Sequence, residues 1–194
     1  MLLRNAITGI FLAACSLHAI AQTGNGPSTK QHKFSIYGGI GPNYYFNNLV
    51  IGKSLVNSFN YSFSGRFMWE PGHLLSLGIE SGYYRLYTMN TPDSTQAHIA
   101  NSAIPIQLVL SMKFLKAFYV NFSMGQSILL NKVKSQTYGN FDASTWSLAD
   151  LAGTIGYRQR LTERISIGAE IKYFYSSGFV DRNIAIFFVC GYTF

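Results

Sequence analysis

Apolar and polar side chains alternate along most of the chain after residue 32. Between Phe59 and Trp69 every second residue is aromatic or glycine, and the residues between them are mostly polar. The same period of two recurs in the last eleven residues, which end at Phe194. Such alternation predicts a β-strand with one apolar face and one polar or small face. Eight segments show it, at 33–45, 56–69, 74–88, 102–114, 118–130, 146–160, 165–176 and 184–194.

The length of these segments favours strands that cross a membrane. Most have 11–15 residues, whereas soluble strands usually have about 5–6 and tilted membrane strands need about 9–11. No stretch after the N-terminal region has the roughly 18 continuous apolar residues of a membrane helix. The segments therefore predict an all-β fold, an eight-stranded antiparallel transmembrane up-and-down β-barrel over residues 33–194.

The connections between the predicted strands alternate in length, which predicts an orientation. Outer-membrane barrels have short periplasmic turns and longer external loops. An even number of strands then places both chain ends in the periplasm. The short connections are at 70–73, 115–117 and 161–164, and the long ones are at 46–55, 89–101, 131–145 and 177–183.

The first 21 residues read as a cleaved secretory signal peptide. Met1-Leu2-Leu3-Arg4 is a short positive start, an apolar stretch runs from Ile7 to Leu17, and Ala19-Ile20-Ala21 has the small-residue pattern of a cleavage site. Residues 22–32 are then a flexible periplasmic leader. An alternative is open, because Leu12-Ala13-Ala14-Cys15 resembles a lipobox, in which Cys15 would carry a lipid.

Two places break the regular pattern. Pro105 has no amide hydrogen for a closed ladder, so the sequence predicts a bulge or a late ladder start there. Trp146 and Leu148 are out of phase with Leu151 and Ile155. This phase change predicts a bulge near Asp150.

Composition and charge exclude several classes of protein. Only 12% of residues are charged and 48% are hydrophobic, which excludes a disordered chain. Two cysteines exclude a disulfide scaffold and a multi-cysteine zinc module. The pI is about 9.4, but the cations are scattered and the predicted compartment is outside the cytoplasm. We therefore expect no nucleic-acid partner.

The inward positions of the predicted strands carry a few charges among small and polar residues. In one turn register, Glu80 opposes Ser64 and lies diagonally from Arg66, while Glu170 precedes Lys172 by two on one face. Buried charges are retained when they are paired, so a polar network that braces the lumen is expected. A proton or ion path, or a small-ligand site, is the alternative. The predicted lumen residues are Arg66, Glu80, Lys113, Arg158, Glu170 and Lys172.

The outward face ends in aromatic residues, which predict interface girdles. The predicted periplasmic girdle contains Trp69, Phe114, Tyr157 and Phe194, and the external girdle contains Tyr44, Tyr83, Tyr87, Tyr175 and Trp146. Basic residues near the external rim are candidates for contact with lipopolysaccharide phosphates, or are ordinary loop charges. They are Lys53, Arg85, Lys132 and Lys134.

Candidate catalytic chemistry is sparse. A serine nucleophile needs a base within hydrogen-bond reach, and His98 is the one mature-chain histidine on the predicted external side, near Asp93, Ser94 and Ser102. His98 and Asp93 are two ligands where a zinc site needs three or four. We expect no catalytic residue, no metal and no cofactor. A lipid A-modifying enzyme built on the external loops is the alternative.

The last strand ends in Tyr192-Thr193-Phe194. A terminal Phe on an amphipathic strand resembles the signal read by the barrel-assembly machinery. Tyr192 and Phe194 are therefore the predicted assembly signal. In a barrel this strand also pairs with the first one, so no exposed edge remains.

The chain resembles the small eight-stranded outer-membrane barrels common in Bacteroidetes, which include PorT-like proteins. The residues that carry the likeness are Tyr37-Gly38-Gly39-Ile40-Gly41, Ile104-Pro105-Ile106 followed by Leu108, Leu110 and Lys113, and the signal-peptide end at Ala21-Gln22. The resemblance implies a barrel and an outer-membrane address. Members are mostly of unknown function, and some serve secretion or envelope assembly.

The expected function is therefore non-catalytic: a structural role, contact with lipopolysaccharide, or partnership with envelope or secretion proteins. A narrow conduit or small-ligand binder stays open beside the lipid A-modifying enzyme.

Overall fold

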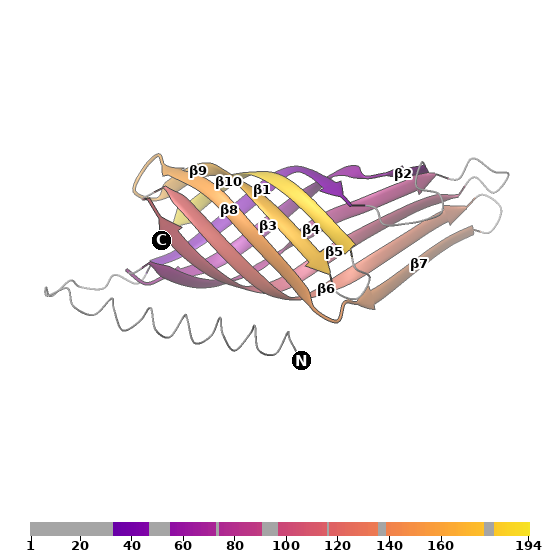
Figure 1. The fold of residues 1–194 in the computed structure, drawn as a ribbon, viewed down its shortest axis with the longest axis horizontal. Helices are drawn as coiled ribbons and strands as arrows, with labels where there is room; N and C mark the ends of the chain where they lie inside the picture. Colours follow the sequence, from indigo (N-terminus) through magenta and orange to yellow (C-terminus); the bar gives the residue numbers. More distant parts are fainter. Residues whose placement is uncertain are drawn as a thin grey trace, which may run out of the picture. The chain divides into compact units, whose positions relative to one another are not determined.

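The chain forms a closed antiparallel β-barrel in the computed structural model, which describes residues 33–46, 55–72, 74–90, 97–115, 117–135, 139–176 and 181–194. Among these residues, eight strands close the ring, because the last strand pairs with the first and β4 pairs with β5. Figure 1 shows the strands tilted around the barrel. The predicted fold class is confirmed. The ring is built from β1 (Lys33–Tyr45), β3 (Phe59–Glu70), β4 (Leu75–Asn90), β5 (His98–Phe114), β6 (Phe118–Ser135), β8 (Asp150–Arg160), β9 (Ile165–Ser176) and β10 (Asp181–Thr193).

The two ends of the barrel differ. At one end, which we call the turn end, β3 joins β4, β5 joins β6 and β8 joins β9. The last strand also ends there, where the backbone N–H of Thr193 donates to Arg164 O at 2.8 Å. The opposite end is the loop end. The short strand β2 (Val56–Asn57) pairs with β4 at the loop end, and β7 (Gly139–Trp146) pairs with β6.

One side of the wall extends farther at the loop end. Gly125 is the last β6 residue paired with β8, and β6 continues from there to Ser135 against β5 and β7. These strands project to the right in Figure 1. The sequence predicts a loop at 131–145, and this prediction is wrong for most of the segment. Its side chains are mostly polar, with Val133 and Phe141 paired on one face, so the regular apolar alternation of the other strands is lost here.

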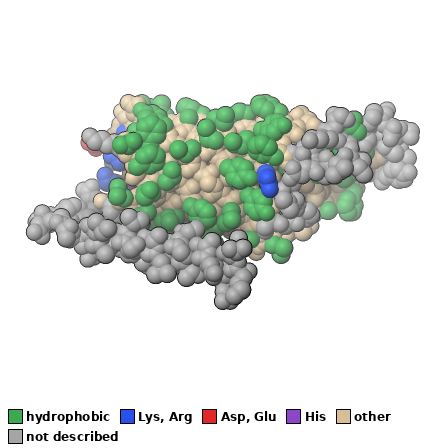
Figure 2. Space-filling view, viewed as in Figure 1, with side chains coloured by type: hydrophobic (Ala, Val, Ile, Leu, Met, Phe, Trp, Pro, Cys, Tyr) green, Lys and Arg blue, Asp and Glu red, His purple; other side chains and the backbone are tan. Residues whose placement is uncertain are grey.

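Side chains alternate between a filled interior and an apolar exterior. Leu108 and Ile79 are paired on neighbouring strands and are 66% and 58% exposed. Figure 2 shows hydrophobic side chains spread over the barrel wall. A soluble monomer rarely exposes apolar patches larger than a few hundred Å², so this surface is suited to lipid. The outward apolar residues include Ile36, Ile40, Phe63, Phe67, Leu77, Leu110, Phe122, Ile155, Ile171, Ile186 and Phe188.

The predicted irregularity near Asp150 is present. Ile128 pairs with Trp146 and Gly125 pairs with Asp150, so two β6 residues face three residues between β7 and β8. This is a β-bulge. The Ser147 hydroxyl accepts from the Ser127 N–H at 2.7 Å and donates to Asp150 Oδ2 at 2.8 Å. The side chain therefore replaces the ladder contact that the extra residue removes.

Pro105 is accommodated by a gap in the β4–β5 ladder. The pairing runs from Ser81↔Ile106 directly to Tyr84↔Ala103 without a change of register. A register shift follows between Arg85 and Tyr87. The missing proline donor therefore leaves a local gap, and the bulge that accompanies it lies a few residues away.

Several predictions lie outside the described residues. These are the signal peptide at 1–21 with Cys15, the leader at 22–32, and the side chains of Lys53, Asp93 and Ser94. Of the residues that the structure describes, none belongs to a helix long and apolar enough to cross a membrane.

Candidate functional site

Four charged side chains form a connected network inside the barrel. Arg66 Nε donates to Glu80 Oε2 at 2.8 Å, and Arg66 Nη2 donates to Glu170 Oε1 at 2.9 Å. Lys172 Nζ donates to the other oxygen of Glu80. All four residues are buried, with Arg66 the most exposed at 5%. Two cations balance two carboxylates, which is the arrangement that a buried charge cluster requires.

Neutral side chains from β6 complete the network. The Tyr119 hydroxyl donates to Glu170 Oε2 at 2.6 Å. The Asn121 amide fits its neighbours when its oxygen accepts from Arg66 Nη1 at 2.9 Å and its nitrogen donates to Ser111 Oγ at 2.7 Å. The network therefore ties β3, β4, β6 and β9 together across the lumen.

The observed pairing differs from the predicted turn register. Glu80 faces Arg66 directly, and Gly82 faces Ser64. The predicted opposition of Glu80 and Ser64 is wrong by two residues, because the β3–β4 turn is longer than assumed. Lys172 also bonds to Glu80 across the lumen, whereas the sequence places it beside Glu170 on the same strand.

A second charged cluster lies at the turn end. Glu70 accepts from the Tyr37 hydroxyl and from Lys113 Nζ, one on each carboxylate oxygen. Arg158 Nη2 is 3.7 Å from Glu70 Oε1. The Arg158 guanidinium lies 4.1 Å from the Tyr37 ring centroid and 5.1 Å from that of Tyr119. The predicted lumen residues Lys113 and Arg158 thus form a group separate from the four central charges.

This second cluster borders a cavity of about 540 Å³ at the turn end. Tyr37, Tyr119 and Arg158 lie on the side nearest the central network, since Tyr119 also bonds to Glu170. Residues of the β8–β9 turn form the outer part. The cavity is lined by Tyr37, Glu70, Lys113, Ala117, Phe118, Tyr119, Tyr157, Arg158, Gln159, Arg160, Thr162, Glu163, Arg164, Ile165, Ser166 and Thr193.

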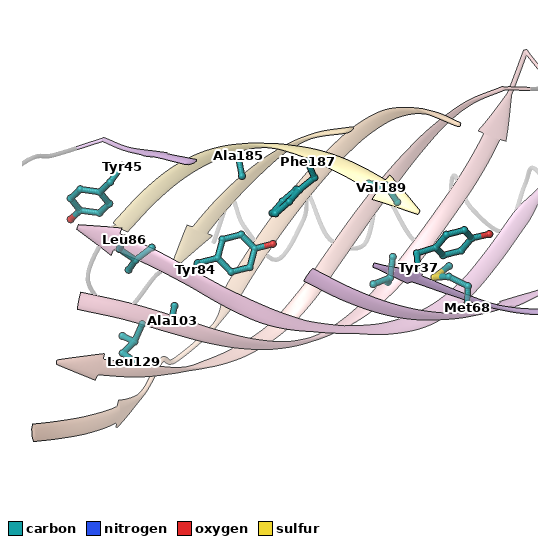
Figure 3. Packing of buried hydrophobic residues seen from close by; sticks show 11 residues of the cluster. Tyr37, Tyr45, Met68, Tyr84, Leu86, Ala103, Leu129, Ala185, Phe187 and Val189 are labelled. Atoms are coloured by element: carbon teal, nitrogen blue, oxygen red, sulfur yellow. The ribbon is translucent and has the colours of Figure 1, made fainter. Parts of the chain in front are cut away.

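On the other side of the central network an aromatic layer fills the lumen. Figure 3 shows two of its members, Tyr84 and Phe187, among the buried hydrophobic side chains. The Tyr84 ring stacks on Phe174 at 5.6 Å and meets the edge of Phe187 at 6.0 Å. Lys172 Nζ lies 5.5 Å from the Tyr84 centroid. The sequence predicts small or polar inward positions and misses this layer. The inward phase of Phe174 and Phe187 within their strands is the signal that could have found it.

The prediction that Tyr87 belongs to the external aromatic girdle is wrong. Its ring packs against the inward-facing Tyr45, with centroids 5.1 Å apart. The β4 bulge between Arg85 and Tyr87 shifts the alternation, so Tyr87 turns from the lipid face toward the interior. Tyr83, by contrast, lies among the outward aromatic side chains, stacked on Phe63 at 5.7 Å.

The predicted external cations that the structure describes lie at the loop end. Lys132 and Lys134 are exposed on the extended part of β6. The Arg85 guanidinium lies 5.4 Å from the ring centroid of outward-facing Tyr61. Arg182 is also exposed at this end, and sequence reasoning did not single it out.

The candidate catalytic residues are separated. His98 Nδ1 is hydrogen-bonded to Asn90 Oδ1 at 2.6 Å. The Ser102 hydroxyl is bonded to the Tyr83 hydroxyl at 2.7 Å and lies four residues along the strand, about 13 Å from His98 at the rise of a β-strand. These two side chains do not form a nucleophile–base pair. Within the described ranges, no group of three or more His, Cys, Asp or Glu side chains is placed to hold a metal ion.

The predicted assembly residues are exposed at the turn end. Tyr192 and Phe194 make an edge-to-face ring contact at 5.1 Å. The Phe194 backbone N–H donates to Phe34 O at 2.9 Å, so the chain terminus extends the β1–β10 seam.

Comparisons with known proteins show the fold. No protein-family model matches the chain, and no curated protein sequence matches it. Ail, the attachment invasion locus protein of Yersinia pestis, solved with the heparin analogue sucrose octasulfate, is 14% identical with a TM-score of 0.56. The match covers 84% of this chain and 99% of Ail. Neisserial surface protein A is 13% identical with a TM-score of 0.51, covering 83% and 97%. The chain therefore has the fold of small eight-stranded outer-membrane barrels.

Proposed function

We propose that this chain is an integral outer-membrane barrel with a non-catalytic, structural role in the cell envelope, whose loop end faces outward and contacts lipopolysaccharide. The observation that carries the proposal is the combination of a lipid-suited wall with a lumen filled by paired charges. A closed barrel satisfies every backbone polar group within the bilayer, as a membrane-spanning structure must.

The contents of the lumen favour a structural role over a conduit. Arg66 and Glu170 are joined across the interior, and the Tyr84–Phe174–Phe187 layer lies beyond them. Eight-stranded barrels are just wide enough for side chains to fill them. The charged side chains are already hydrogen-bonded to one another, so an ion would have to displace several charge-assisted hydrogen bonds to pass through the lumen.

The cations at the loop end support a contact with lipopolysaccharide. Arg85 lies over an outward aromatic ring, and Lys132 and Lys134 are exposed beyond it. Phosphate groups of an anionic lipid surface attract such residues at about 1 kcal/mol for each cation. Lys53 was predicted for the same contact and lies outside the described residues.

The separation of His98 from Ser102 weighs against the enzyme alternative. A role in secretion or envelope assembly, as in some members of the Bacteroidetes family that the sequence resembles, is the more specific form of this proposal. It would require a protein partner, which co-purification in mild detergent would reveal.

The test compares cations at opposite ends of the barrel. Lys132→Gln with Lys134→Gln should weaken the binding of purified lipopolysaccharide to the folded protein by about 2 kcal/mol, or roughly thirtyfold. The control, Lys33→Gln at the turn end, should leave this affinity unchanged. Equal losses in both variants, or no loss in either, would contradict the proposed contact.

A further inference from the structure

The turn-end cavity is a cationic cup. Four of its lining residues are cations, Lys113, Arg158, Arg160 and Arg164, and two are carboxylates, Glu70 and Glu163, so the lining carries a net charge of +2. Figure 2 shows basic side chains at the end of the barrel where Figure 1 marks the C-terminus. The volume of about 540 Å³ falls within the range of small-molecule sites, roughly 300–1,000 Å³.

Glu70, the inner carboxylate of the cup, is already engaged in hydrogen bonds. Both oxygens of Glu70 accept hydrogen bonds, one from Tyr37 and one from Lys113. Arg158 therefore reaches Glu70 only at 3.7 Å, beyond the 2.7–2.9 Å typical of a charge-assisted hydrogen bond. Arg158 therefore makes no short hydrogen bond to Glu70, and it lines the cavity.

Two tyrosine rings hold Arg158 in place. Its guanidinium carbon lies 4.1 Å from the Tyr37 centroid and 5.1 Å from the Tyr119 centroid. Each ring in turn is anchored by its hydroxyl, Tyr37 to Glu70 and Tyr119 to Glu170. A guanidinium fixed between aromatic rings has its fork of donors pre-oriented, which suits planar or tetrahedral oxyanions.

The outer cations complete the cup. Arg160 and Arg164 are exposed on either side of the β8–β9 turn. Arg164 Nη1 makes a long contact of 3.4 Å to the Tyr192 hydroxyl. No ion pair within the described residues engages either guanidinium. Both side chains are therefore available to a ligand that enters from the turn end.

We propose that this cup binds a small molecule, or the end of a chain, that carries two or more oxyanion groups, with Arg158 as the inner contact and Arg160 and Arg164 as the outer ones. Phosphate and carboxylate are the two sources of this chemistry. The site would face the periplasm under the orientation proposed above, but binding itself does not depend on that orientation.

The experiment is calorimetric titration of the folded, full-length mature protein in neutral detergent at physiological salt. The probes are pyrophosphate, citrate and uncharged trehalose. Pyrophosphate, citrate or both should bind saturably, and trehalose should not. Arg160→Gln with Arg164→Gln should weaken binding at least about tenfold, because charge-assisted hydrogen bonds are lost. Arg158→Lys should also weaken it, since lysine keeps the charge but not the fork.

The control is Arg182→Gln, which removes an exposed cation at the opposite end and should leave anion binding unchanged. Binding of pyrophosphate alone would assign the site to phosphates, and binding of citrate alone would assign it to carboxylates. The absence of binding by both anions, or equal weakening by the Arg160→Gln, Arg164→Gln double variant and by Arg182→Gln, would overturn the proposal.

Discussion

The Tyr119 ring lies directly over Gly156, its partner on the neighbouring strand, and leaves no room for a side chain there. This close approach lets the Tyr119 hydroxyl reach Glu170 and lets its ring face Arg158. One glycine thus positions a side chain that joins the central network to the turn-end cup.

Gly156→Ala should therefore destabilise the barrel. The added methyl group would force the Tyr119 ring away, and overpacking of this kind costs about 1–3 kcal/mol. The measurement is the free energy of unfolding in urea for protein folded into lipid vesicles. Gly153→Ala on the same strand is the control, because a methyl group there meets open space. Equal stability of the two variants would contradict the role given to Gly156.

Arg66→Leu should be more damaging, since it leaves two carboxylates with Lys172 as their remaining network cation. Removal of one partner from a buried charge cluster costs about 3–5 kcal/mol. Lys134→Leu, at an exposed position, should change the free energy of unfolding little. A loss below about 1 kcal/mol for Arg66→Leu, typical of a surface ion pair, would show that the network does not brace the barrel.

Planar-bilayer recordings should show no single-channel steps for the unmodified protein, because paired charges and aromatic rings fill its lumen. Arg66→Ala and Glu80→Ala are informative comparisons, since both residues lie in the central network. Regular steps that change in these two variants would favour the conduit over the structural role.

Ile79→Lys should destabilise the barrel in a lipid bilayer by about 2–4 kcal/mol, the cost of a cation facing the membrane interior. Ile79 is outward and lies beside Glu80 of the central network. Phe141→Lys is the control, because Phe141 is similarly exposed on β7, on the part of the wall that extends past the ring. The free energy of unfolding in lipid vesicles should be lower for Ile79→Lys than for Phe141→Lys. A neutral effect of Ile79→Lys would contradict the lipid-facing assignment.

Deletion of Phe194 should lower the amount of folded protein in the outer membrane of cells severalfold, while folding of the purified chain into detergent continues. Leu161→Ala, an exposed apolar change at the same end, is the control and should not alter assembly. Normal levels of the folded protein in the outer membrane without Phe194 would contradict its role in the predicted assembly signal.

The strands were predictable because each one repeats the same two-residue period over its full length. The bounds of β1 and β9 coincide with the predicted segments, and the bulge before Asp150 follows from a visible change of phase. The extension of β6 and β7 was not predictable in this way. Its side chains are mostly polar, with Val133 and Phe141 among the few apolar ones, and such a segment resembles a loop.

The site was predictable only as a set of inward charges. The partner of Glu80 depends on the turn register, which differs by two residues from the expected one. The bond from Lys172 to Glu80 joins strands that meet only across the lumen. Similarly, Tyr87 faces the interior because of a backbone bulge that no apolar pattern marks.

The most direct test of the membrane barrel is the heat-modifiability of the protein in an isolated outer-membrane fraction. The unboiled sample should run faster in an SDS gel than the boiled one, since a closed barrel stays folded in the detergent. An unshifted band in the soluble periplasmic fraction would contradict both the membrane barrel and the structural role proposed for it.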